Sequence, residues 1–482
     1  MKNLIAHSIA ILLILVFAFS PVWATCGGGG GGGAGGMSSR SGSEAAVYTV
    51  PWKPRKPKDP PPMGLVLYWF PASENEWKNS SLRESRTLSL YASQCVLMEV
   101  GTTQTPNIDR LVGESRLPVA VLASPDGTPV TKVENKDGKL KVADVERVVA
   151  GEVKQREAAL DGSLKAAKAK ATAGDNAAAV KLYQAVAAEK CMFPKKAKDA
   201  AKELKKLGVT DIGSIPESPI FDARQSALIE LTMRRGLWAE INARYVLAEK
   251  LYAQAHVMDP ADPTPLRYLG EVYRHHIGDW DKARTTFEAI LNMPADPLSR
   301  AVALHGLGKM TIHDGEFKKG LALMEQAVEE FPLALAYRNL AVYWNSEGDP
   351  KKGNEYTQQA LALDPKDPYN LVFAAVFMAA FGHKDEALKI ARENTNLLPA
   401  SYNLAAIYAQ NGQRDKALAL LKRHFYQYER YQTVRAKEMM EARVDAVFDS
   451  IREDPAFVAL TSGADGKLPI PMKGMSGSRE NR

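Results

Sequence analysis

Three histidines are the first residues whose type could support chemistry. His275 and His276 are adjacent, and His313 lies in a later segment with a helical pattern. A metal site needs several His, Cys or carboxylate ligands at close spacing, and no cysteine or carboxylate cluster accompanies these histidines in the sequence. We interpret them as solvated side chains, and the sequence predicts neither a metal site nor a cofactor.

A short run with two glycines and a lysine, Gly306–Lys309, resembles part of a phosphate-binding loop. Such a loop follows a β-strand, whereas this run lies inside a segment with a helical pattern, so we do not assign it to nucleotide binding. The sequence also supports no Ser–His–Asp or paired-carboxylate arrangement. No catalytic residue is proposed, and the protein is predicted not to be an enzyme.

The chain contains the three cysteines Cys26, Cys95 and Cys191. None of them belongs to a CxxC pair or to a metal-ligand spacing, and three cysteines cannot build a disulfide framework. Cys95 opens an apolar run, where a free cysteine usually behaves as a small buried hydrophobe. We expect Cys95 to be a core residue without a resolving partner.

The N-terminus has the features of a secretory signal. Lys2 supplies a positive charge, an apolar run extends from Ile9 to Phe19, and Val22-Trp23-Ala24 resembles a signal-peptidase site. The apolar run is short for a membrane span. Residues 1–24 are therefore predicted to be a signal peptide, and the protein to be exported, periplasmic or facing the extracellular side.

Cys26 leaves the nature of the mature N-terminus open. It could be the lipidated first residue of a lipoprotein, although Trp23 and Thr25 depart from the aliphatic and small residues of a lipoprotein box. The protein could instead be exported in soluble form, or the apolar run could remain as an uncleaved N-terminal anchor. Apart from such an anchor, contact with a membrane is predicted only through a lipid on Cys26.

Length and charge narrow the class of protein. A chain of 482 residues suggests about two to four folded units. The 62 basic and 56 acidic residues give a formal charge of +6, a small excess for this length, so nucleic-acid binding is not predicted.

Two segments with different compositions follow the signal. Residues 25–62 change from polyglycine through serine-rich to proline-rich sequence and are interpreted as a Gly/Ser/Pro-rich linker without a core. Residues 63–155 combine strand-like apolar runs with helical patterns and predict one small α/β domain. Strands are expected near 65–70, 95–100, 117–122 and 130–133, and helices near 80–92, 108–113 and 142–153.

This domain resembles the thioredoxin-like fold. The resemblance rests on a first strand that ends in Trp69-Phe70 and on Leu117-Pro118, which enters a strand that closes on Pro125-Asp126-Gly127. It implies a cis peptide bond before Pro118 and a redox dithiol just after the first strand. Ala72–Trp77 occupies that place and contains no cysteine. Because thiol exchange needs a thiolate and a resolving thiol, we expect a redox-inactive module.

The second half of the chain repeats at intervals of about 34 residues. Small residues that open the second helix of each pair recur at Ala248, Ala283, Gly320, Gly353, Ala387 and Ala417. Turn glycines recur at Gly278, Gly315, Gly348, Gly382 and Gly412. The pattern resembles the tetratricopeptide-repeat (TPR) family, which implies stacked antiparallel helix pairs.

The predicted fold class is therefore multidomain, with an α/β thioredoxin-like domain followed by an all-α TPR solenoid. A helical TPR-like connector is expected over 156–210, the solenoid with its C-terminal cap over 221–460, and a disordered tail over 461–482.

In TPR proteins the first helix of each pair forms a concave face that binds peptides, so the resemblance implies a groove here. Its outward positions are predicted to be Arg267, Glu271, Arg274, His305, Lys309, Arg338 and Asn345. This mixed, mildly basic set would suit an acidic peptide or a C-terminal carboxylate. The alternative is that these residues are only solvated helix positions.

Two functions remain open at this point. The first is an extracytoplasmic scaffold that binds a partner protein or peptide through the groove, with the thioredoxin-like domain as a second docking module. The second is a thiol-related or redox accessory protein that acts through the thioredoxin-like domain. The absence of a cysteine from Ala72–Trp77 favours the first.

Overall fold

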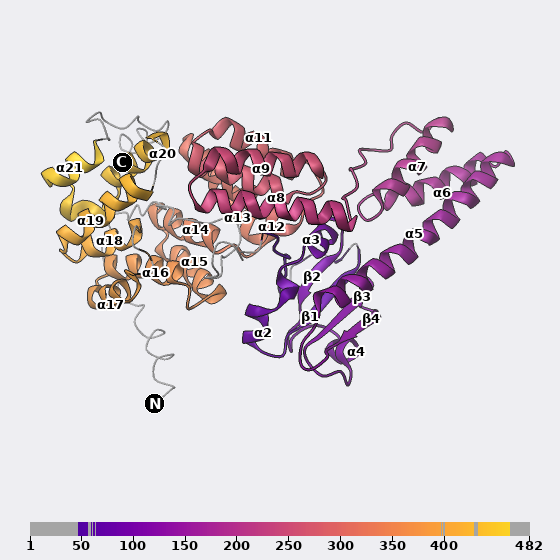
Figure 1. Ribbon diagram of the computed structural model, residues 1–482, viewed down its shortest axis with the longest axis horizontal. Helices are drawn as coiled ribbons and strands as arrows, with labels where there is room; N and C mark the ends of the chain where they lie inside the picture. Colours follow the sequence, from indigo (N-terminus) through magenta and orange to yellow (C-terminus); the bar gives the residue numbers. More distant parts are fainter. Residues whose placement is uncertain are drawn as a thin grey trace. The chain divides into compact units, whose positions relative to one another are not determined.

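A computed structural model describes residues 47–55, 59, 61–62, 64–396, 398, 401–428 and 432–462 (Figure 1). The contacts divide the chain into two units. The N-terminal unit runs from the first described residue to Ala336, and the C-terminal unit contains Tyr337–Tyr428 and residues 436–462. The predicted signal peptide, Cys26 and the C-terminal tail beyond residue 462 lie outside the described residues, so these predictions stay predictions.

The N-terminal unit begins with a four-stranded sheet in the order β2-β1-β3-β4. The strands are β1 (Val66–Phe70), β2 (Leu97–Val100), β3 (Val119–Ala123) and β4 (Pro129–Glu134). β1 pairs in parallel with β2, and the β1–β3 and β3–β4 pairs are antiparallel. All four strands were expected from the sequence, and the Leu117–Pro118 peptide bond is cis, as predicted.

Helices cover both faces of this sheet. On one face, Leu67 and Trp69 pack in a core with Leu88 of α3 (Arg86–Ser93) and Val145 of α5 (Val142–Thr172). On the other, Tyr68 and neighbouring strand residues pack with α4 (Ile108–Val112). The short elements α2 (Glu74–Asn79) and η1 (Ser81–Arg83) precede α3. The sequence pattern over 80–92 therefore corresponds to η1 and most of α3, separated by a break.

The end of the predicted linker belongs to the folded domain. Val50 and Trp52 are buried in the same core as Trp69, and the Trp52 indole donates to the Leu82 carbonyl at 2.7 Å. Lys53 forms a bridge beside Glu99 on β2, the edge strand. The prediction of a core-free linker over 25–62 is wrong for this stretch, because isolated apolar residues between prolines can pack once a partner surface exists.

Helix α5 crosses the boundary expected at residue 155. It has 31 residues and continues from the sheet into a helical connector with α6 (Asn176–Ala188) and α7 (Pro194–Lys206) (Figure 1). Ala167, Tyr183 and Leu204 share the core of this connector. Helices thus lie at the residues of the predicted connector, and α5 makes them continuous with the α/β domain.

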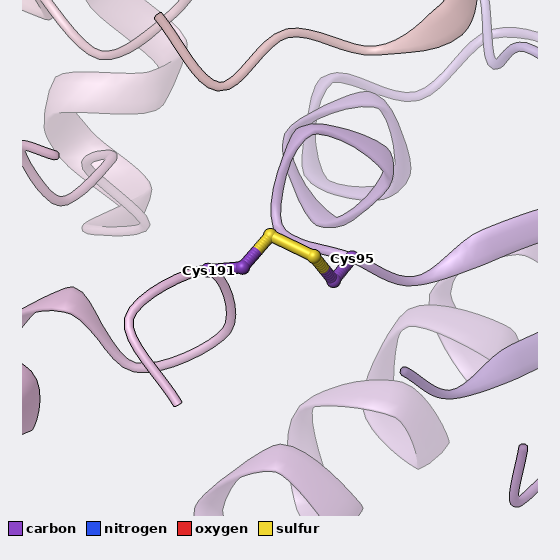
Figure 2. Close-up of a disulfide and its surroundings, with 2 residues drawn as sticks. All are labelled: Cys95 and Cys191. Carbon is purple, nitrogen blue, oxygen red and sulfur yellow. A yellow bond between two sulfur atoms is a disulfide. The ribbon is translucent and has the colours of Figure 1, made fainter. Parts of the chain in front are cut away.

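A disulfide joins Cys95 to Cys191 (Figure 2). Cys95 precedes β2, and Cys191 lies in the loop between α6 and α7. Met192 and Phe193, which follow Cys191, are buried in the core of the sheet. The prediction that Cys95 has no partner is wrong. A sequence separation of 96 residues gave no local signal that the two cysteines would meet.

The N-terminal unit also holds the first helix pairs of the array. They are α8 (Ala223–Ile241) with α9 (Tyr245–Met258), α10 (Thr264–Glu271) and its π-helical continuation η2 (Val272–Ile277) with α11 (Trp280–Leu291), and α12 (Pro297–His313) with α13 (Phe317–Glu330). An irregular stretch separates α7 from α8.

Further pairs form the C-terminal unit. These are α14 (Ala334–Ser346) with α15 (Pro350–Leu363), α16 (Pro368–Ala380) with α17 (Lys384–Asn394), and α18 (Tyr402–Gln410) with α19 (Arg414–Arg423) and η3 (His424–Tyr428). The elements α20 (Gln432–Val444), η4 (Ala446–Ile451) and α21 (Pro455–Thr461) follow. Met439, Phe448 and Phe457 bury their side chains in the core of this unit, as expected of a cap.

The repeat register predicted from the sequence is confirmed. All five predicted turn glycines have φ between 69° and 93°, a conformation that glycine adopts without strain. Between helices, a Cβ atom on Gly353 would lie 2.9 Å from the Ala341 carbonyl oxygen. Small residues are therefore required where α14 and α15 approach each other.

Candidate functional site

The seven predicted groove residues lie on the first helices of successive pairs. Arg267, Glu271 and Arg274 belong to α10 and η2, His305 and Lys309 to α12, and Arg338 and Asn345 to α14. The first five are buried, with at most 8% of each residue exposed. The prediction that these five face outward into an open groove is wrong. Whether any of the seven contacts a partner stays a prediction.

A segment of the chain itself without helix or strand, Val47–Lys53, contacts the repeats. The Tyr48 hydroxyl donates to Asp262 Oδ2 at 2.8 Å, and the Tyr268 hydroxyl donates to the Val47 carbonyl at 3.2 Å. Lys53 Nζ donates to the Glu330 carbonyl at the end of α13 at 3.1 Å. The first repeats therefore bind this non-helical segment through side-chain and backbone groups.

A buried ion cluster joins the α/β domain to the same repeats. Arg86, the first residue of α3, pairs with Asp259 and with Asp262 in the loop after α9. Its guanidinium also donates to the Ile220 carbonyl at 2.8 Å and lies over the Tyr48 ring. Together with a hydrogen bond to the Ser226 hydroxyl of α8 at 2.8 Å, these contacts from one planar group fix the orientation of the domain on α8–α10.

This cluster has a defined charge state. Burial disfavours the charged form of Arg86, but Asp262, Tyr48 and Asp259 outweigh burial and raise its pKa. Burial and the nearby Asp262 carboxylate raise the pKa of Tyr48 well above its ordinary value. Tyr48 is therefore a neutral donor, and Arg86 is the cation that balances the aspartates.

A second polar cluster lies further along the first helices. Arg274 pairs with Glu271 at 2.8 Å, and both side chains are almost fully buried. Burial, together with the nearby Arg274, His276 and Lys309, lowers the pKa of His275 well below its ordinary value. His276 stacks on Tyr245 with ring centroids 4.1 Å apart. The expectation of a solvated side chain is wrong for His313, which is buried. The His275 and His276 side chains are 28% and 15% exposed and are therefore only partly solvated.

Arg338 and Asn345 differ from the other predicted groove residues because both are only half-buried. Arg338 Nη1 donates to Asn370 Oδ1 at 2.6 Å, and Asn370 in turn donates to the Ala360 carbonyl at 2.9 Å. Arg338 therefore reaches from α14 to α16.

The place expected for a dithiol holds a carboxylate instead. Ser73 caps α2 by accepting from the Glu76 N–H, and the Ala72 N–H donates to Glu76 Oε2 at 2.7 Å. Burial raises the pKa of Glu76. Neither sulfur of Cys95 or Cys191 is available for exchange while the disulfide is intact.

Neither a metal-binding cluster nor a membrane-spanning helix is found in the part of the chain that the structure describes. No group of three or more His, Cys, Asp or Glu residues is arranged to hold a metal ion. No helix among these residues is long and apolar enough to cross a membrane.

No family model matches this chain. Among curated proteins, it is similar to the Protein CTR9 homolog of Arabidopsis thaliana, with 24% identity over 230 residues. The match covers 37% of this chain and 21% of that protein, so the chain spans about a fifth of the length of this relative.

Two solved structures are also similar. One is a monomeric IFIT1 mutant with Gppp-AAAA, at 17% identity and a TM-score of 0.32, covering 57% of this chain and 67% of that one. The other is the APC/C hetero-tetramer Cut9–Hcn1, at 14% identity and a TM-score of 0.30, covering 59% and 62%.

The helix pairs, the turn glycines and the close contacts at small residues define the class of protein. It is a TPR-like helical repeat protein with a small N-terminal four-stranded sheet. Proteins built from TPR-like repeats generally mediate protein–protein interactions.

Sequence reasoning missed the residues that bind the Val47–Lys53 segment. Asp259 and Asp262 lie between α9 and α10, where they resemble ordinary turn residues. Tyr48 precedes a proline-rich stretch that was interpreted as linker. The one available signal was the density of aromatic and β-branched residues in Val47–Trp52, which is unusual for a flexible tether.

Proposed function

We propose that this protein is an extracytoplasmic scaffold that binds a partner polypeptide through the first helices of its repeat pairs. A redox-inactive thioredoxin-like module is proposed to serve as a second docking unit. The proposal follows from the class of fold, from the bound segment in the N-terminal unit, and from the sequence features of the N-terminus.

The observation that carries the proposal is the binding of Val47–Lys53. Tyr268 recognises a backbone carbonyl, and Asp262 recognises a tyrosine hydroxyl. A contact to a backbone carbonyl is open to any peptide, and the side-chain contact adds selectivity. Tyr268 lies on the first helix α10, whereas Asp262 lies in the loop before it. A partner peptide would be bound by such contacts from first helices and from the loops that precede them.

The segment also indicates where a partner would bind. The segment contacts the first repeats. Five of the predicted groove residues are buried in these repeats: Arg267, Glu271, Arg274, His305 and Lys309. Arg338 and Asn345 on α14 are half-buried and remain the candidate groove positions. Arg338 supplies a positive charge for an acidic side chain or a C-terminal carboxylate.

The experiment on binding uses the full chain, tagged at its C-terminus, to retain partners from an envelope fraction. We expect Arg338→Ala and Asn345→Ala to weaken retention of the same partner. The loss of the Arg338–Asn370 hydrogen bond should cost only about 1 kcal/mol of stability. Lys318→Glu, an exposed change on α13, is the matched control. Equal retention by the parent and both α14 variants would contradict the groove assignment.

Two features support export. The first 24 residues resemble a signal peptide, and disulfides such as Cys95–Cys191 persist in oxidising compartments. Deleting residues 2–24 should leave the protein in the cytoplasm with Cys95 and Cys191 reactive toward thiol reagents, whereas the parent should be exported with both protected. Export of the truncated form would exclude the signal assignment.

The strand order supports a thioredoxin-like module, and the residues after β1 support the absence of redox activity. We expect no reduction of insulin by the purified protein. Activity that is lost in Cys95→Ser would instead favour a thiol-related accessory role.

A further inference from the structure

Helix α8 begins the repeat array and exposes apolar side chains along one side. Leu228, Leu231, Trp238 and Ile241 are each between 42% and 54% exposed. Their helical spacing places them together, opposite Ile229, Met233 and Leu237, which are buried. One side of α8 therefore packs in the array, and the other presents an apolar stripe.

The equivalent stripe is covered in a later pair. Gly236 of α8 and Gly308 of α12 are the small residues at matching places in their repeats. When these two glycines are aligned, Leu231, Arg234 and Trp238 of α8 correspond to Ala303, Gly306 and Met310 of α12. Those residues are buried, and a Cβ on Gly306 would lie 2.3 Å from the Phe287 ring of the preceding helix α11. In α12, this side is the one that receives the preceding helix.

Charge indicates what kind of helix would fit. The exposed charged residues of α8 are all basic: Arg224, Arg234 and Arg235. Arg244, just beyond α8, lies 5.0 Å from the Trp238 ring. Tryptophan and arginine are the residues that most often dominate binding energy at protein interfaces.

We propose that the α8 stripe, defined as Leu228, Leu231, Trp238 and Ile241 with the flanking arginines, binds an amphipathic helix of another polypeptide that carries acidic residues beside its apolar face. The bound helix would take the place that α11 occupies beside α12. This surface is separate from the α14 positions of the proposed groove.

Other occupants fit less well. Helix α7 precedes α8 but carries mainly lysines, and its apolar residues Ala200 and Leu204 are already buried in the connector. A second copy paired through α8 about a twofold axis would bring arginines against arginines. Residues 1–46 and 463–482 contain few acidic residues and therefore lack the complementary charge.

The test uses the full chain and a designed helical peptide of about 20 residues, long enough to hold a helix in water. The peptide carries leucines at helical spacing flanked by glutamates, and a matched peptide carries lysines in their place. We expect the acidic peptide to bind and the basic one not to bind, with affinity that falls as salt is raised. Trp238→Ala and Arg235→Glu should each weaken binding about tenfold or more.

The controls are Lys318→Glu for the charge change and Val458→Ala for the loss of an exposed apolar side chain on α21. Both should bind like the parent, and circular dichroism should show that all variants are folded. Equal binding of the two peptides, or no effect of Trp238→Ala and Arg235→Glu, would overturn the proposal. So would an α8-dependent dimer in sedimentation, or α8-dependent binding to anionic phospholipid vesicles with no binding of the acidic peptide.

Discussion

The two units of this protein use different kinds of contact. In the N-terminal unit, a non-repeating domain is fixed to the first repeats by the buried Arg86–Asp259–Asp262 cluster and, within the domain and its connector, by the Cys95–Cys191 disulfide. In the C-terminal unit, successive pairs and the cap share one apolar core. The junction between the α/β domain and the repeats occurs once and needs directional contacts. The junctions between successive repeats can instead rely on the complementary shape of their apolar surfaces.

The small residues of the first helices show the same contrast. The repeat register places Gly236, Gly270 and Gly308 in the N-terminal unit, and Ala341, Ala375 and Ala405 at the matching places in the C-terminal unit. A Cβ on Gly270 would lie 2.3 Å from the buried Phe287 ring. Gly236 and Gly270 thus make room for the rings of Tyr252 and Phe287, whereas Gly308 lies against the Gly320 carbonyl oxygen. In the C-terminal pairs the matching places hold the methyl groups of alanines.

The largest expected effect is at the ion cluster. Arg86→Ala would leave Asp259 and Asp262 buried without their cation, a loss that typically costs about 3–5 kcal/mol. Denaturant unfolding and hydrogen exchange should show this loss in α3 and α9, with exchange in α18 unchanged. Arg300→Ala removes a half-exposed pair with Glu330 and should cost less than about 1 kcal/mol. Equal effects of the two changes would remove the contrast between buried and surface pairs.

Breaking the disulfide should have the next largest effect. Cys191→Ser opens a loop closed over 96 residues and should lower stability by about 2–4 kcal/mol. The difference between the unfolding of the parent with and without reductant measures the same loss of stability. Reductant should not change the unfolding of the variant. If the variant and the parent unfold alike under oxidising conditions, the disulfide does not stabilise the unit.

Overpacking tests the small-residue contacts in both units. Gly353→Leu would force a side chain against the Ala341 carbonyl, and Gly270→Ala would press a methyl group on Phe287. Overpacking of this kind costs about 1–3 kcal/mol. We expect each variant to lower the melting temperature, with accelerated hydrogen exchange first in its own unit. A parent-like melt of Gly353→Leu would mean that the contact between α14 and α15 tolerates a large side chain.

Acidification should give the smallest effect, in the N-terminal unit. The pKa of His275 in the folded protein lies well below its ordinary value of 6.5. Below pH 6.5 the unfolded chain therefore binds more protons at this residue, and stability falls as the pH is lowered. His275→Gln should reduce the fall in melting temperature between pH 7.5 and 5.5, whereas mutation of the exposed His383 to Gln should not. An unchanged slope in His275→Gln would exclude this contribution.

The sequence predicted the repeats well because each contact lies within one or two helix pairs. Small residues, turn glycines and apolar spacing act over a few turns of helix, so their positions could be read directly. The α/β domain was predicted in outline for the same reason. Its strands are continuous apolar runs, but the division of 80–92 into η1 and α3 depends on Ser85, whose side chain caps α3 by accepting from Leu88.

Exposure along the first helices could not be predicted from the same pattern. Arg267 and Lys309 occupy positions that a polar side chain usually holds in contact with water, yet both are buried. Polar residues tolerate burial when charged or hydrogen-bonding neighbours compensate. For Arg267 one such neighbour is Asp296, which caps α12 and comes from another segment of the chain.

The sequence by itself determined the order of elements, the repeat register and the absence of cysteine after β1, because these follow from residue type and short spacing. Only the tertiary structure decided that Val47–Lys53 lies against the repeats, that Cys95 meets Cys191, and that Arg86 pairs with Asp259 and Asp262. Each of these contacts joins residues from 96 to more than 200 positions apart. No local periodicity encodes such a pair, and its partners are selected only when the packed elements bring them together.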